Sequence, residues 1–137
     1  IYKESDLNSL NEVKMIVIES VNHIGITVSD LENSIRFYKD LFDFDVIENI
    51  SNSGQAFLKM GDILLSLVEV KGYKHSKDSK SCISFYVDEE DFQDAIDEIG
   101  EMELEVVSGP ENIRKGERVV FADPDGNLIE LSYPKID

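Results

Sequence analysis

Apolar and polar side chains alternate along residues 18–28, and a period of two predicts a strand with one apolar face. His23 falls on the polar side of this strand. The apolar side is formed by Ile24, Ile26 and Val28. The strand should therefore bury one face in a core and leave His23 on the opposite face.

The pattern changes to helical spacing after this strand. Ser29-Asp30-Leu31-Glu32 predicts a capping box, with Ser29 as the N-cap and Glu32 at the third helical position. The apolar residues that follow share one helix face, namely Leu31, Ile35, Tyr38 and Phe42. This face is expected to pack against the apolar face of the strand.

The strand-and-helix plan occurs a second time, with an offset of 59 residues between His23 and Cys82. Residues 82–87 correspond to the first strand, and a helix that opens at Asp88 corresponds to the first helix. Gly100 is predicted to cap the end of that second helix. A repeat of this length indicates two copies of one supersecondary unit.

Three short strands are expected after each helix, because turn-forming residues interrupt the apolar runs. They are predicted at residues 45–50, 55–60, 63–70, 104–107, 118–122 and 127–133. Asp123-Pro124-Asp125-Gly126 is predicted to form the tight turn before the last strand.

The chain is therefore predicted to fold as a single α+β domain over residues 15–137. Its two units should span 16–70 and 81–134, and a polar, basic linker should join them at 71–80. Residues 1–14 are expected to be a leader or an extension without an assigned role.

Composition narrows the function classes. The net charge of −16 argues against nucleic-acid partners and against anionic membrane surfaces. The single cysteine, Cys82, cannot form an internal disulfide, which favours a reducing compartment, and no signal-peptide or membrane-spanning pattern is present. We therefore expect a cytoplasmic protein whose partner is a small molecule.

The stretches NHIGITVSDLENSIRFYKDLF and ADPDGNLIEL resemble the vicinal oxygen chelate superfamily, which includes glyoxalase I, extradiol dioxygenases and the fosfomycin- and bleomycin-resistance proteins. The resemblance covers residues 21–133. It implies two βαβββ units that form a curved mixed sheet around a cup, with the helices on the convex face.

The resemblance also implies a metal site built from four strands. Its four positions fall on His23, Ser66, Cys82 and Glu130 in this chain. Serine is a poor ligand and cysteine is an unusual one for the family, so any divalent metal should bind weakly, and zinc, nickel or iron suit an imidazole ligand best. Glu69 and His75 are further donors, although neither occupies a position that the family uses.

Three of these residues have a second interpretation that involves no metal. His23 can be a hydrogen-bonded residue of a polar cup, and Glu130 can pair with Arg118. Cys82 can be a small buried side chain.

Two functions follow from the resemblance. The first is a metal-dependent lyase or isomerase of the lactoylglutathione lyase type, in which Glu130 moves a proton. The alternative is a metal-free protein that sequesters a small molecule, as antibiotic-resistance proteins do. Members with two units per chain commonly pair, so a homodimer formed by edge pairing or by module exchange is expected.

Overall fold

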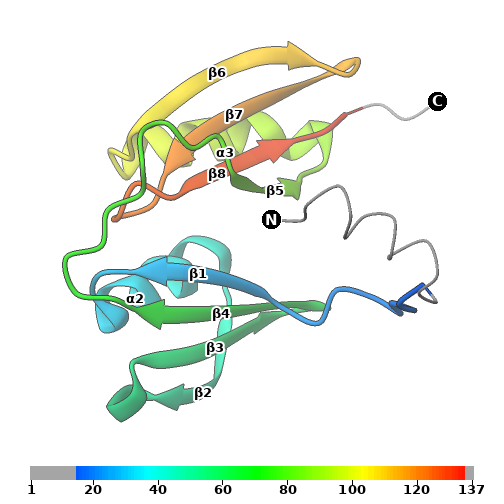
Figure 1. Cartoon of the computed structure of the whole chain (residues 1–137). Coiled ribbons are helices and arrows are strands. Elements are labelled where there is room, and N and C mark those ends of the chain that lie inside the picture. The colour runs from blue at the N-terminus through cyan, green and yellow to red at the C-terminus, as the bar shows by residue number, and fades with distance from the viewer. Residues whose placement is uncertain (1–14, 135–137) are drawn as a thin grey trace.

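A computed structural model describes residues 15–134 of the chain (Figure 1). The segment 1–14, predicted to be a leader or an extension, lies outside the described residues. The first unit consists of β1 (Ile24–Val28), α2 (Leu31–Phe42), β2 (Asp45–Ile50), the 3₁₀ turn η1 (Ser51–Ser53), β3 (Gln55–Met60) and β4 (Ile63–Glu69). The second unit consists of β5 (Cys82–Tyr86), α3 (Glu89–Glu101), β6 (Val106–Ile113), β7 (Gly116–Ala122) and β8 (Leu128–Ser132).

Each unit forms its own four-stranded mixed sheet. The strand orders are β1-β4-β3-β2 and β5-β8-β7-β6, so the two units repeat one topology. β1 pairs in parallel with β4, β5 pairs in parallel with β8, and the other neighbours are antiparallel. The predicted α+β fold of two βαβββ units is confirmed. β1 and β5 are the inner edges of the two sheets and face each other across the middle of the molecule (Figure 1).

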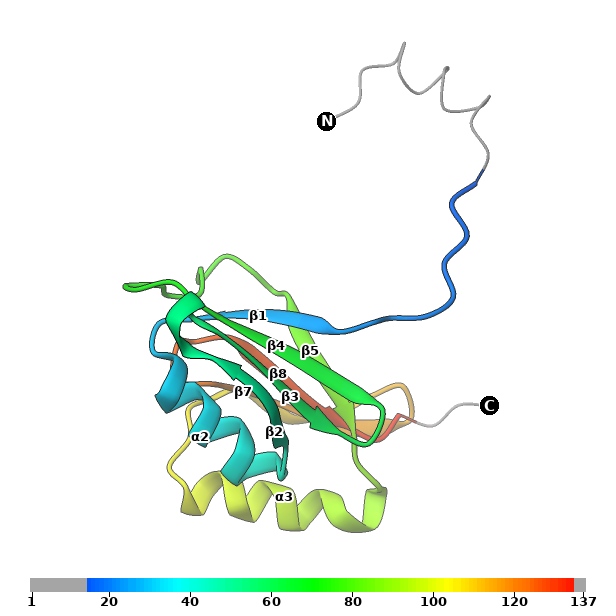
Figure 2. The same cartoon turned by 90° about the horizontal axis from the view of Figure 1, so that it is seen from below.

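Both helices lie on the same side of the sheets (Figure 2). Strand alternation directs the apolar residues to this side, so Ile26 and Val28 are buried. The aromatic ring of Phe42 in α2 reaches across to the second unit, where it lies 5.2 Å from the ring of Phe85 and 6.4 Å from that of Phe121. The two sheets therefore share one hydrophobic core. No helix of the described residues is long and apolar enough to cross a membrane.

The N-cap of α2 is Asp30, and the prediction of Ser29 is wrong. The Asp30 carboxylate accepts a hydrogen bond from the backbone N–H of Asn33 at 3.0 Å. Ser29 is unavailable because its backbone N–H and its hydroxyl both donate to the Asp125 carboxylate. A partner 96 residues away thus decides which residue caps the helix.

Gly100 is not the cap of α3, because the helix continues to Glu101. The chain reverses two residues after the helix end, where Glu103 takes the left-handed conformation with φ 55°. The backbone N–H of Leu104 then donates to the carbonyl of Ile99 at 3.1 Å and closes the turn.

The first strand is shorter than predicted. It begins at Ile24, which pairs with Leu65 near the start of β4, so the preceding residues have no strand beside them in the described part of the chain. This segment leads away from the body of the molecule (Figure 2). Its apolar side chains are between 78% and 91% exposed, namely Met15, Ile16, Val17, Ile18 and Val21.

A buried hydrogen-bond network centred on Asp123 joins the two units. The Asp123 carboxylate is 5% exposed and accepts hydrogen bonds from the Tyr38 hydroxyl at 2.7 Å and from the Asn127 side-chain amide at 2.9 Å. The same amide donates to the Thr27 carbonyl at the end of β1. The tight turn predicted at Asp123–Gly126 therefore also carries the hydrogen bonds that join the two units.

We predict that Tyr38→Phe lowers the free energy of unfolding by about 1.5–3 kcal/mol, the usual contribution of a hydrogen bond to a charged group. Burial raises the pKa of Tyr38, so the phenol keeps the proton that it donates to Asp123. Urea unfolding measures the change. Tyr86→Phe is the matched control, because that side chain is 67% exposed and its loss of a hydroxyl should be nearly neutral. Equal losses of unfolding free energy in both variants would contradict this account of the Asp123 network.

Candidate functional site

The residues expected at the site lie on the sheet faces that the helices leave uncovered, which we call the open faces. On β8, Ile129 and Leu131 point into the core at 1% and 5% exposure, and Glu130 between them points the other way. His23 and Ser66 belong to the open face of the first sheet, and Cys82 and Glu130 belong to that of the second.

Ser66 is buried and already has a partner. It is 2% exposed, and its hydroxyl oxygen accepts a hydrogen bond from the side-chain amide of Gln55 at 2.9 Å. Its strand neighbours on the open face are Gly25 and Phe57. The hydroxyl therefore has a structural role in the sheet, which fits its poor suitability as a metal ligand.

His23 is exposed and directly precedes the first residue of β1. Its ring lies edge-on to Phe57, with 5.8 Å between the centroids and an interplanar angle of 84°. Its Nδ1 atom is 2.7 Å from the side-chain oxygen of Asn22. One ring nitrogen is thus oriented by a hydrogen bond, and Nε2 remains for another partner.

Cys82 and Glu130 are neighbours on the second sheet. The Cys82 Sγ atom is 4.0 Å from the Glu130 Oε2 atom. This proximity follows from the register, in which Ser84 pairs with Glu130 and Cys82 precedes Ser84 by two residues on the same face. Cys82 is exposed, so the interpretation of a buried cysteine is wrong. The reason is that Cys82 lies on an edge strand and points away from α3.

Arg118 does not pair with Glu130, which corrects a second expectation. The Arg118 Nε atom is 2.9 Å from Glu111 Oε1 on β6. In the register, Arg118 lies opposite Ser132, and Glu130 lies opposite Val120. The Arg118 guanidinium therefore pairs with a carboxylate on β6, whereas Glu130 lies on β8, the other neighbour of β7.

The two additional donors have other roles. Glu69 Oε2 accepts a hydrogen bond from the backbone N–H of Leu31 at 2.8 Å, on the helix side of the sheet. His75 lies against the turn before β8, where its backbone N–H donates to the Asp125 carbonyl at 3.0 Å. Glu69 therefore does not join Cys82 and Glu130, and His75 lines a groove with Cys82 that does not include Glu130.

The single chain does not bring His23 to the Cys82–Glu130 pair. β1 and β5 run in opposite directions in Figure 1, so the starts of these strands lie at opposite ends of the space between them. The Asn127–Thr27 hydrogen bond holds the end of β1 near the start of β5. His23 is four residues before Thr27, which corresponds to about 13 Å along a strand.

Metal-ligating residues gather elsewhere in the described part of the chain. One group of three or more His, Cys, Asp or Glu side chains has its donor atoms within 4.8 Å of one another, and it consists of the exposed residues Asp88, Glu90 and Asp91.

The imidazole, thiol and carboxylate of His23, Cys82 and Glu130 are a suitable donor set for a divalent ion. One chain supplies two of the three together, so the full set of His23, Cys82 and Glu130 stays a prediction.

A cavity of about 170 Å³ adjoins Glu130 on the open face. Its lining includes Ser84, Tyr86, Arg114 and Ser132. Strand alternation could have identified the two serines, since they share the face of Glu130. Arg114 gave no such signal, because it lies in the β6–β7 hairpin turn with φ 45°.

The surroundings of Cys82 keep its thiol protonated. Partial desolvation raises the pKa of the Cys82 thiol although the residue is exposed, the Glu130 carboxylate raises it further, and Arg118 lowers it. The thiol is therefore a poor nucleophile and a weak ligand at neutral pH until a nearby cation offsets Glu130.

We predict that Glu130→Gln lowers the pKa of Cys82 and that Arg118→Gln raises it. Loss of the carboxylate removes a charge that disfavours the thiolate, and loss of the guanidinium removes one that favours it. The pH profile of alkylation of the metal-free protein by iodoacetamide measures both shifts, because Cys82 is the single cysteine. Glu48→Gln on the first sheet is the control. A profile that moves equally in all three variants would show that Cys82 does not sense these neighbours.

Comparisons with known proteins show fosfomycin-resistance relatives. The chain is 39% identical over 117 residues to the metallothiol transferase FosB of Staphylococcus epidermidis strain ATCC 12228, which covers 83% of this chain and 81% of the relative. The structure of the fosfomycin resistance protein FosX from Mesorhizobium loti is similar, with a TM-score of 0.71, 28% identity, and coverage of 88% and 96% of the two chains.

The fold is also shared with FosX from Listeria monocytogenes, solved with Mn(II) and 1S,2S-dihydroxypropylphosphonic acid. That structure has a TM-score of 0.78 and 19% identity, and covers 88% of this chain and 95% of its own. The family model for the Glyoxalase/Bleomycin resistance protein/Dioxygenase superfamily matches residues 20–131. Repeated topology, open-face residues and sequence agree, and the chain belongs to this superfamily of vicinal oxygen chelate proteins.

Proposed function

We propose that the protein is a divalent-metal-dependent enzyme that transfers a small thiol to an electrophilic substrate of the fosfomycin class. The observation that carries this proposal is the Cys82–Glu130 pair on an open face of a chain similar to a metallothiol transferase. The lactoylglutathione lyase activity expected from the family as a whole has no support from these relatives.

We propose further that the working form is a homodimer. Within the described residues β1 and β5 each pair with a strand on one side only, so their inner sides are unpaired, and the apolar segment before β1 is highly exposed. A second copy that covers this segment and these edges would also bring His23 of one chain to Cys82 and Glu130 of the other. Edge pairing and module exchange both satisfy this requirement.

The donor set of such a dimer consists of one imidazole, one carboxylate and one thiol. A divalent ion held there would polarise an oxygen of the substrate. The neighbouring side chains would orient the substrate, because the hydroxyls of Ser84, Ser132 and Tyr86 can donate hydrogen bonds and Arg114 offers a positive charge to a phosphonate.

The reaction would form a sulfur–carbon bond and break a carbon–oxygen bond of the substrate. The thiol loses its proton as it attacks, and the released oxygen gains a proton. Glu130 is the carboxylate within reach of this exchange, in keeping with the role expected for it.

Metal-free sequestration of a small molecule is the second candidate. It is favoured by the raised pKa of Cys82, which weakens the third donor, and by the burial of Ser66 at the second of the four family positions. Both functions use the cavity beside Glu130, and turnover separates them.

We predict weak binding of Zn²⁺ or Mn²⁺, with at least about a tenfold loss of affinity in His23→Ala and in Glu130→Gln. Acid should weaken binding further, because a protonated imidazole cannot act as a ligand. Isothermal titration of the reduced protein measures the affinity, and Glu111→Gln, a carboxylate elsewhere on the same sheet, is the control.

The matching activity assay follows loss of fosfomycin in the presence of a small thiol, with and without metal. Metal-dependent consumption supports the proposed enzyme. Binding of fosfomycin without consumption, together with no metal binding, would contradict it and leave sequestration as the function.

A further inference from the structure

The linker between the two units is positively charged in an acidic chain. Residues 71–80 contain Lys71, Lys74, Lys77 and Lys80 and one acidic residue, Asp78, whereas the whole chain has a net charge of −16. A concentration of lysines against such a background creates a local positive potential.

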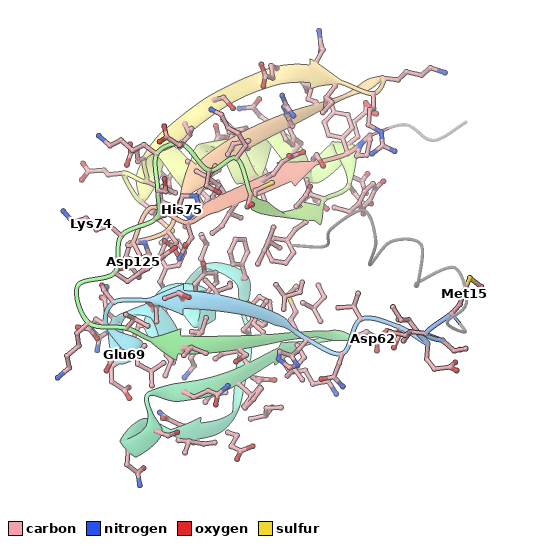
Figure 3. The ribbon with its side chains drawn as sticks, viewed as in Figure 1. Met15, Asp62, Glu69, Lys74, His75 and Asp125 are labelled. Carbon is pink, nitrogen blue, oxygen red and sulfur yellow. The ribbon has the colours of Figure 1, made fainter. Side chains whose placement is uncertain are left out.

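Three of these lysines line a cavity of about 540 Å³ between the linker and the turn before β8. The linker residues that line it are Tyr73, Lys74, His75, Ser76, Lys77, Ser79 and Lys80. Lys71 does not line it. Figure 3 shows Lys74, His75 and Asp125 grouped on one side of the molecule, where the linker passes the turn.

Hydrogen bonds hold this part of the linker in place. The backbone N–H of His75 donates to the Asp125 carbonyl at 3.0 Å, and the Tyr73 hydroxyl donates to the Asn127 side chain at 2.9 Å. The backbone N–H of Ser79 donates to the carbonyl of Ser76 at 3.1 Å and forms a turn. The cavity wall is therefore tied to the same network that joins the two units.

The polar groups of the wall are mostly free donors. Lys74, Lys77 and Lys80 form no ion pair within residues 15–134. The hydroxyl oxygens of Ser76 and Ser79 accept hydrogen bonds from backbone N–H groups at 3.2 Å, so each hydroxyl proton remains available for a ligand. His75 Nε2 is buried without a hydrogen-bond partner in the described chain.

Two carboxylates line the opposite wall. Asp125 accepts two hydrogen bonds from Ser29, which occupy its oxygens. Glu105 has no such partner in the described chain and would repel an anion. The three lysines nevertheless outnumber the two carboxylates of the lining.

We propose that the linker cavity binds the phosphoryl or phosphonate group of a small molecule. Three lysines and two serines line this cavity, and ammonium and hydroxyl groups are the donors that a tetrahedral dianion accepts charge-assisted hydrogen bonds from. The site does not depend on the proposed metal centre, because His23, Cys82 and Glu130 are not among its lining residues.

The cavity adjoins a groove of about 320 Å³ between β1 and β5, with which it shares Tyr73, His75 and Leu128. Cys82 lies in that groove.

Titration of the full chain with inorganic phosphate and with methylphosphonate at low ionic strength tests the proposal. Isothermal titration gives the affinity, and amide chemical shifts locate the site. We expect saturable binding with shifts concentrated in residues 73–80. Lys77→Gln and Lys80→Gln should each weaken binding about three- to tenfold, the effect of losing one charge-assisted contact.

The matched control is Lys71→Gln, the same change in charge on the same linker but outside the cavity, which should alter the affinity less than about twofold under salt screening. Glu105→Gln should strengthen binding. Equal losses from Lys71→Gln and Lys77→Gln, or an absence of saturable binding, would overturn the proposal. Succinate binding as tightly as phosphate would overturn the assignment to a tetrahedral anion. His23→Ala should leave the phosphate affinity unchanged, which separates this site from the metal centre.

Discussion

The rest of the structure depends on the hydrogen bonds that the buried carboxylate of Asp123 accepts. The carboxylate accepts one hydrogen bond from the Tyr38 hydroxyl of the first unit and one from the Asn127 side-chain amide of the second. The same amide donates a hydrogen bond to the Thr27 carbonyl at the end of β1. A buried charge needs several hydrogen bonds to be tolerated, and here they come from both units. The position of β1 beside β5, the groove between them and the course of the linker at Tyr73 all follow from this contact.

The same arrangement limits what one chain can do. The repeat places His23 and Cys82 at matched positions of two similar units, but the inner edge strands run in opposite directions (Figure 1). Matched positions at the starts of such strands are separated, while Cys82 and Glu130 share one sheet and stay close. A site that needs an imidazole as well as this pair therefore has a physical reason to be shared between two copies.

The 59-residue repeat and the family resemblance predicted the fold, and period-two alternation predicted the face on which each candidate side chain lies, because a strand has two faces and one of them is buried. Features that depend on distant partners could not be predicted. Ser29 loses its capping role to a contact with Asp125, and Arg118 pairs with Glu111 on the adjacent strand β6, where the register of the β6–β7 pair shifts. The exposure of Cys82 follows from its place on an edge strand, which composition does not reveal.

Complementation between two inactive variants tests the shared site most directly. Chains that carry His23→Ala and chains that carry Glu130→Gln should each fail to bind metal as homodimers. When they are co-expressed, a mixed dimer would hold one intact site, formed by His23 of one chain and Glu130 of the other, so about one quarter of the wild-type metal sites should return at random pairing. Isothermal titration of the mixture measures this fraction. Recovery near that value supports a site between two copies, and an absence of recovery from dimers that have mixed would contradict it.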